Sequence, residues 1–144
     1  MRSAQGPVRS SPVTTAPPTR EPRPVPAPLA VAVSLVAVEA GVFLLLGVVE
    51  ATQASGERLA LAVTATLFFL LWSGGLAVCA WNLWRLESWA RAPVVLAQLI
   101  QILVGGSFWG GSTTGVAVVA IAVGVLALAG IFHPQSLAAL ESSD

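Results

Sequence analysis

An apolar run of 21 residues, from Leu29 to Val49, is the feature that most constrains how this chain can fold. A hydrocarbon core about 30 Å thick needs roughly 20 helical residues, so the run is long enough to cross a bilayer. Its one ionisable side chain, Glu39, lies at the centre. An acidic side chain at midspan costs about 2.5–3.5 kcal/mol on insertion scales, so we expect Glu39 to face protein or a water-filled cavity.

The composition of the whole chain points to the same class of protein. Of its 144 residues, 56% are hydrophobic and 10% are charged, and the mean hydropathy is +0.82. These values are typical of an integral membrane protein and not of a soluble domain. The formal net charge of zero argues against a nucleic-acid partner, and the single cysteine, Cys79, cannot form an intramolecular disulfide.

Three further apolar runs follow the first, separated by short polar connections. Pro93 suits the first turn of a helix, where its missing N–H is harmless. Pro134 disfavours helix at the residue before it and closes the last run, leaving residues 135–144 as a short tail. The sequence therefore predicts an all-α, four-helix transmembrane bundle over residues 29–134, with spans at 29–49, 59–81, 93–109 and 115–132.

The first 28 residues have a different composition from the spans. They hold eight of the ten prolines and four of the seven arginines, which predicts a disordered tail. The run 22–28 favours polyproline II, either as a docking ligand or, more commonly, as a solvated spacer. The first span exceeds the apolar region of about 7–15 residues in a cleaved signal peptide, so we expect it to be retained.

Arginine distribution predicts the orientation of the chain in the membrane. With four spans, both tails and the 82–92 connection lie on one side, which holds six of the seven arginines. Only Arg58 lies opposite. The positive-inside rule therefore predicts a multi-pass protein of the cell membrane with cytoplasmic termini.

Tryptophan and arginine side chains gather between the second and third spans: Trp81, Trp84, Arg85, Trp89 and Arg91. We interpret them as an interfacial belt, with indoles at headgroup depth and guanidinium groups near lipid phosphate. Glu87 and Arg91 have the i, i+4 spacing of a helical ion pair. The alternative function for this segment is a site for a small anionic ligand or a lipid headgroup.

Polar residues from several spans are expected at similar depths in the membrane. At about 1.5 Å per residue, Glu39 lies ~15 Å from the cytoplasmic end of its helix, and Ser73 and Gln101 lie ~12 Å from theirs. Gln98, Gln101 and Gly105 share one helix face, which should point inward because lipid cannot satisfy the two amides. The sequence predicts a buried intramembrane polar cluster of Glu39, Ser73, Gln98 and Gln101.

Small residues on the spans would let neighbouring helices approach closely: Ala37, Gly41, Gly74, Gly75, Gly105 and Gly124. Three roles for the polar cluster remain open. A protonated Glu39 donating to Gln101 would fix the packing of the helices, Glu39 would exchange protons in a transporter, or its side chain would contact a partner subunit.

Sequence signatures of catalysis are not found. The glycine-rich segment 105–115 lacks the lysine of a phosphate-binding loop. His133 has no companion metal ligands nearby, and no Ser/His/Asp set or pair of carboxylates is present. We expect neither an enzyme nor a bound metal or cofactor.

The pattern Leu83-Trp-Arg-Leu-x-x-Trp89-Ala-Arg-x-Pro93-Val-Val-x-x-Gln98-Leu resembles a group of small actinobacterial integral membrane proteins with no assigned activity. That resemblance covers about residues 29–134 and implies a four-span protein of the cell membrane. Glu39, in the first of four short spans, is also similar to the membrane-embedded glutamate of the small multidrug resistance family. This sequence departs from that family in having no tyrosine, a strong charge bias and a long tail.

These observations predict a non-catalytic accessory or scaffold subunit that packs against a larger membrane protein or a second copy of itself, with lipids around it. The alternative function is a small proton-coupled transporter with Glu39 as the protonation site. A third is a lipid-binding protein that uses the region of Arg85 and Arg91.

Overall fold

The structure, a computed structural model, describes residues 24–142, so residues 1–23 of the predicted tail lie outside the described residues. The prediction of an all-α fold with four long apolar helices is confirmed, and the described residues contain no strand. The helices are α1 (Ala27–Thr52), α2 (Leu59–Trp84), α3 (Arg91–Ser107), α4 (Thr114–Ile131) and α5 (Pro134–Glu141). Single 3-10 turns precede α2, α3 and α4 at Gly56–Arg58, Ser88–Ala90 and Gly111–Thr113.

Helix α1 begins at Ala27, two residues before the predicted start of the span. Pro28 does not delay the helix, because a proline among its first residues lacks only an N–H that would have no partner within the helix. The tail predicted to be disordered through residue 28 therefore overlaps the first turn of α1.

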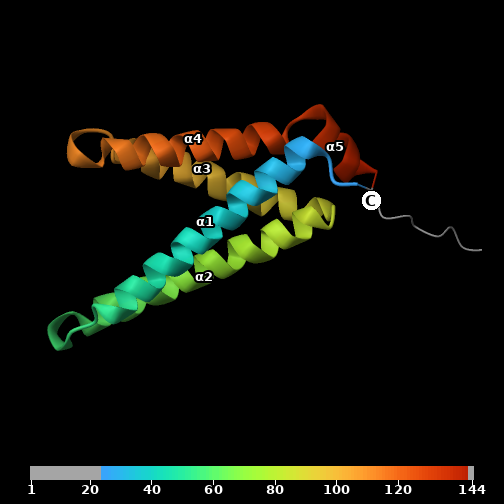
Figure 1. Cartoon of the computed structure of the whole chain (residues 1–144). Coiled ribbons are helices and arrows are strands. Elements are labelled where there is room, and N and C mark those ends of the chain that lie inside the picture. Colours follow the sequence, from blue (N-terminus) through green and yellow to red (C-terminus); the bar gives the residue numbers. More distant parts are fainter. Residues whose placement is uncertain (1–23, 143–144) are drawn as a thin grey trace, which may run out of the picture.

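The four spanning helices form two hairpins of different length. Helices α1 and α2 have 26 residues each, or about 39 Å, whereas α3 and α4 have 17 and 18 residues, or about 26 Å. The hairpins meet at one end, beside α5 and the α2–α3 connection, and spread apart at the other end (Figure 1). A longer hairpin tilted against a shorter one lets both pairs span the same membrane thickness.

The backbones of α1 and α4 touch at the end where the hairpins meet. A side-chain Cβ atom built at Gly130 would lie 2.6 Å from the carbonyl oxygen of Pro28 and 2.9 Å from the Cβ of Ala32. Only glycine fits there without moving a helix. Leu29, Val36 and Ile131 are fully buried around this crossing and belong to the main apolar core.

The predicted C-terminal tail is largely the helix α5. The α4 helix ends at Ile131, as the position of Pro134 suggests, but Pro134 then occupies the first turn of α5. The buried Ser136 hydroxyl donates to the carbonyl oxygen of Gly130 at 2.6 Å, and Leu140 is 1% exposed. Helix α5 thus packs back against α1 and α4 and covers the end of the core.

In the connection between α2 and α3, Glu87 and Arg91 do not have the helical spacing that was expected to let them form an ion pair. Leu86 has φ 63°, a left-handed conformation that is uncommon outside glycine, and its side chain is buried. Glu87 follows with an extended backbone, so it does not lie one helical turn before Arg91. No salt bridge joins these two side chains.

At the other end of α3, Gly110 and Gly111 both have positive φ, as glycine allows.

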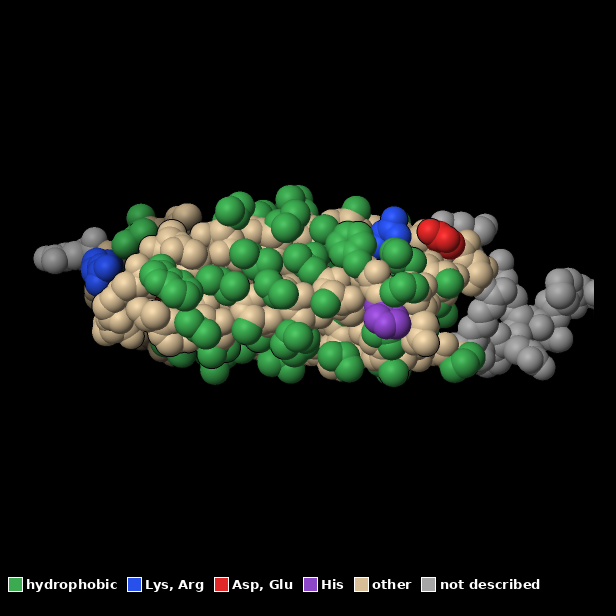
Figure 2. Space-filling model, turned by 90° about the horizontal axis from the view of Figure 1, so that it is seen from above, with side chains coloured by type: hydrophobic (Ala, Val, Ile, Leu, Met, Phe, Trp, Pro, Cys, Tyr) green, Lys and Arg blue, Asp and Glu red, His purple; other side chains and the backbone are tan. Residues whose placement is uncertain are grey.

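The surface of the molecule is dominated by apolar side chains. Figure 2 shows hydrophobic side chains over the length of one face, with charged side chains near its two ends. Leu71, Leu103 and Val116, from three different helices, are each more than 70% exposed. Such an apolar surface fits a lipid environment, since soluble monomers rarely expose continuous apolar patches of this extent.

Candidate functional site

Three of the four residues of the predicted polar cluster meet in the structure. Glu39, midway along α1, is 7% exposed. Its carboxylate accepts hydrogen bonds from Gln98 Nε2 at Oε2, 2.6 Å away, and from Gln101 Nε2 at Oε1, 2.7 Å away. Gln101 Nε2 also contacts the carbonyl oxygen of Ala120 at 3.1 Å. In the structure the polar cluster therefore consists of Glu39, Gln98 and Gln101, without Ser73, and it links α1, α3 and α4.

One of the three roles left open by the sequence has a protonated Glu39 donating to Gln101. In the structure the amide nitrogens donate and both carboxylate oxygens accept. A carboxylate can accept at both oxygens without carrying a proton. Gln98 and Gln101 are both available because residues three apart lie on the same face of a helix.

The polar cluster lies where the two hairpins begin to diverge. The buried residues of α1 fall between Leu29 and Ala40, with the later exception of Gly47. Gly47 faces Phe69 and Leu70 of α2, within its own hairpin. The polar cluster is therefore close to the last layer of contact between the hairpins, and it is well placed to set the angle between them.

Ser73 lies nearby but does not join the polar cluster. Its side chain is buried, and its hydroxyl donates to the carbonyl oxygen of Ala40 at 2.7 Å. Successive residues are about 100° apart around a helix, so Ala40 presents a different face of α1 from Glu39. Ser73 consequently ties α2 to α1, while Glu39 ties α1 to the other hairpin.

One acceptor of the polar cluster has no partner. Gln98 is fully buried, and its Oε1 atom makes no hydrogen bond. A Cβ atom built at Gly124 would lie 3.3 Å from this oxygen and 2.9 Å from Ile102 Cγ1, so the amide lies against the backbone of α4. Gly105 likewise faces α4, with Ile121 Cγ1 3.0 Å from where its side chain would begin.

The other small residues chosen from the sequence do not lie against another described helix of this chain. No described atom lies within 4 Å of a side chain built at Gly41, Gly74 or Gly75, and Ala37 is also exposed. These positions face outward because α1 and α2 pack through other faces. Close approach occurs instead at Gly47 and Gly130, which the sequence analysis did not single out. Small residues recur at this spacing elsewhere in the chain, as at Ala37 and Ala40 or Ala77 and Ala80, so spacing alone does not distinguish Gly130.

The predicted interfacial residues lie together at the end where the hairpins meet. Trp81, Trp84 and Trp89 are 64%, 48% and 55% exposed. Arg85 is exposed and Arg91 is partly buried. This exposure agrees with indole rings that contact lipid headgroups.

Within residues 24–142, no group of three or more His, Cys, Asp or Glu side chains could hold a metal ion.

Comparison with known protein families, with curated proteins and with solved structures finds no match to this chain. The fold itself defines the class of protein. Four helices long and apolar enough to cross a membrane make it a multi-pass membrane protein.

Proposed function

We propose that this protein is a non-catalytic scaffold or accessory subunit of the cell membrane that packs against a membrane partner or a second copy of itself. The observation that supports this function is the small share of each long helix that the chain itself covers. Only 17% of the residues in the apolar stretch of α2, and 33% in that of α1, are buried. The diverging parts of both hairpins offer apolar helix faces to other transmembrane helices.

The polar cluster suits a structural role in such a scaffold. Both oxygens of the Glu39 carboxylate are occupied by amide donors, and the side chain is nearly inaccessible. Interhelical hydrogen bonds in membranes contribute about 0.6 kcal/mol on average and up to about 1.7 kcal/mol. Two of them joining α1 to α3 would hold the hairpins at one angle and so preserve the shape of the partner surface.

The proposed orientation places the end where the two hairpins meet, beside α5 and the α2–α3 connection, in the cytoplasm. Six of the seven arginines then lie on the cytoplasmic side, in accordance with the positive-inside rule. A cysteine-accessibility assay in intact cells tests this orientation, with a cysteine introduced at Ser55 in the α1–α2 connection, on a background in which Cys79 is replaced by serine. Labelling by an impermeant reagent from outside is expected.

The scaffold function is tested by purification of the full chain from native membranes in mild detergent, with stoichiometry from mass spectrometry. A photo-cross-linking residue replaces Leu71 or Leu103, the most exposed leucines of α2 and α3. A scaffold gives a partner in fixed ratio that cross-links from at least one of these positions. Isolation of a lone monomer, with cross-links to lipid only at both positions, would contradict the proposal.

A second function, proton-coupled transport, is favoured by the unpartnered oxygen of Gln98. Rotation of the terminal amide would place this oxygen where Nε2 now lies, 2.6 Å from Glu39 Oε2. That separation suits an O–H···O hydrogen bond from a protonated carboxyl group. The amide of Gln98 therefore offers a partner to either protonation state of Glu39.

Glu39→Gln distinguishes the two functions. A scaffold with a structural Glu39 keeps its partner and nearly its full stability, because glutamine can still hydrogen-bond to the amides of Gln98 and Gln101. A transporter loses proton-coupled flux in liposomes while its fold stays intact. Wild-type liposomes that show no proton flux above empty liposomes would rule out the second function.

A further inference from the structure

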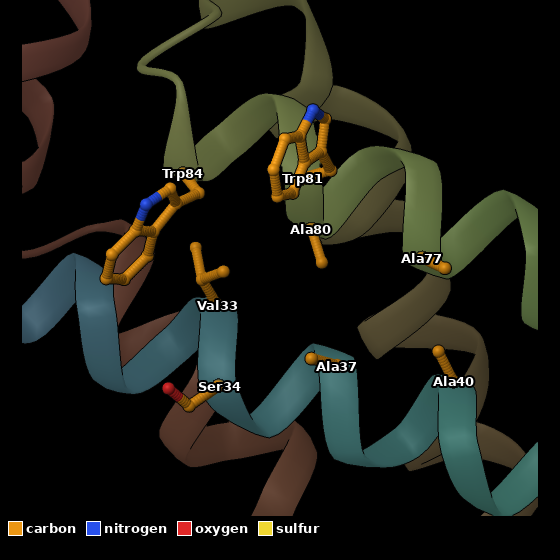
Figure 3. Close-up of a pocket in the computed structure, with 8 residues that line it drawn as sticks. All are labelled: Val33, Ser34, Ala37, Ala40, Ala77, Ala80, Trp81 and Trp84. Carbon is orange, nitrogen blue, oxygen red and sulfur yellow. The ribbon is translucent and has the colours of Figure 1, made fainter.

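A shallow groove of about 360 Å³ runs along the outer face of the α1–α2 hairpin (Figure 3). Alanines from both helices form its floor: Ala37 and Ala40 from α1, and Ala77 and Ala80 from α2. Trp81 and Trp84 stand at one end, toward the α2–α3 connection (Figure 3). Apart from Ser34, whose hydroxyl donates to the carbonyl oxygen of Ala30, the lining is apolar, and its aromatic side chains lie at the end nearest the headgroup region.

That aromatic end combines exposed indole groups with a cation. The side chains of Trp81, Trp84 and Arg85 are exposed, so their N–H groups are accessible to a ligand. Arg85 lies at the C-terminal end of α2, one helical turn after Trp81, and is therefore on the same side of the helix. Indole is a donor only, and guanidinium recognises phosphate with several N–H groups, so this end of the groove suits an anionic oxygen.

The shape of the groove favours a lipid chain over a protein helix. A helix with its side chains is about 10 Å across, so one lying along the groove would meet the two exposed indole rings. An acyl chain is much narrower and can lie over the alanine floor between the helices. The volume is close to the lower limit of about 300–1,000 Å³ for small-molecule sites.

We propose that this groove binds one acyl chain of an anionic phospholipid from the leaflet at the end where the hairpins meet. Arg85 and the two indole N–H groups hold the phosphate, and the four alanines accommodate the chain. The site combines apolar burial with charge complementarity, since lipid headgroups in that layer meet the exposed Arg85. This binding is independent of the scaffold function.

The first test is native mass spectrometry of the purified full chain with added dioleoyl phosphatidylglycerol or dioleoyl phosphatidylcholine, which share acyl chains and differ in charge. We expect tighter retention of phosphatidylglycerol. Arg85→Gln should weaken that retention about fivefold, equivalent to the about 1 kcal/mol that one arginine contributes near an anionic surface, and should leave phosphatidylcholine unchanged. Arg58→Gln, at the opposite end, is the matched control and should change neither.

The second test fills the groove. Ala77→Leu should reduce retention of both lipids, whereas Ala122→Leu, on the exposed surface of α4, should not. Ala37→Leu repeats the test from the α1 side of the groove. The unfolding transition of each variant shows whether its fold is intact. Equal retention of both lipids by the wild type, or unchanged retention in folded Ala77→Leu and Ala37→Leu, would overturn the proposal. So would a co-purifying polypeptide that Ala77→Leu displaces and added phosphatidylglycerol does not.

Discussion

Replacement of Gly130 by alanine tests whether the crossing of α1 and α4 holds the two hairpins together. The new Cβ atom would lie 2.6 Å from the Pro28 carbonyl oxygen, where ordinary contacts begin at 3.4 Å. One helix must therefore move by at least 3.0 − 2.6 = 0.4 Å, and by 3.4 − 2.6 = 0.8 Å to restore an ordinary contact. The obstructing atom belongs to the backbone and cannot rotate away, so the substitution cannot be accommodated by a change of rotamer.

Overpacking of a filled core costs about 1–3 kcal/mol, and a backbone contact places Gly130→Ala in the upper part of that range, at about 2–3 kcal/mol. The matched control is Gly41→Ala, which makes the same chemical change within α1. No described atom lies within 4 Å of the new methyl group there. The control should not destabilise the protein and should gain up to about 0.5–1 kcal/mol from the higher helix propensity of alanine, a gain that Gly130→Ala shares.

The assay is reversible unfolding in mixed micelles, in which the fraction of denaturing detergent is raised and tryptophan fluorescence reports the transition. The five tryptophans of the chain provide the signal. A Gly130→Ala protein as stable as the wild type would refute the close approach of α1 and α4. Equal losses in Gly130→Ala and Gly41→Ala would show that the effect does not depend on the helix contact.

Three further predictions concern other contacts between helices. Gln98→Leu removes one donor from the buried Glu39 carboxylate and should lower the free energy of unfolding in the same assay by about 1–2 kcal/mol; an unchanged value would mean that this bond contributes nothing to stability. Ser73→Ala should cost less than about 1 kcal/mol, because the Ala40 carbonyl keeps its bond within the helix; a larger loss would contradict this. Truncation before Pro134 removes α5 and should increase amide hydrogen exchange in the first turns of α1, as measured by mass spectrometry. Unchanged exchange would show that α5 does not protect them.

Several features followed from local sequence properties and were predictable. An apolar run must be helical in lipid because every backbone N–H and C=O needs a partner within its own segment. Polar side chains within such runs must face other protein groups for the same reason. Those two requirements place Gln98 and Gln101 on the inner face of α3 and make Glu39 their natural partner, even though 58 residues separate Glu39 from Gln98.

The partners of the small residues could not be predicted in the same way. Gly41, Gly74 and Gly75 lie within spanning helices, as Gly124 and Gly130 do, yet only the last two of these five lie against another helix. A glycine permits close approach from any direction, so its presence alone does not say which face of the helix is covered.

The sequence by itself determined the number of spanning helices, their class and the polar residues that must avoid lipid, because those properties depend on each segment and its solvent. Tertiary structure alone decided that Ser73 bonds to Ala40, that α5 folds back over the core, and that the hairpins meet at one end and diverge at the other. These features depend on the rotation of each helix about its axis and on its crossing angle. Both are set by contacts between distant segments, such as Gly130 against Pro28, and no single segment specifies them.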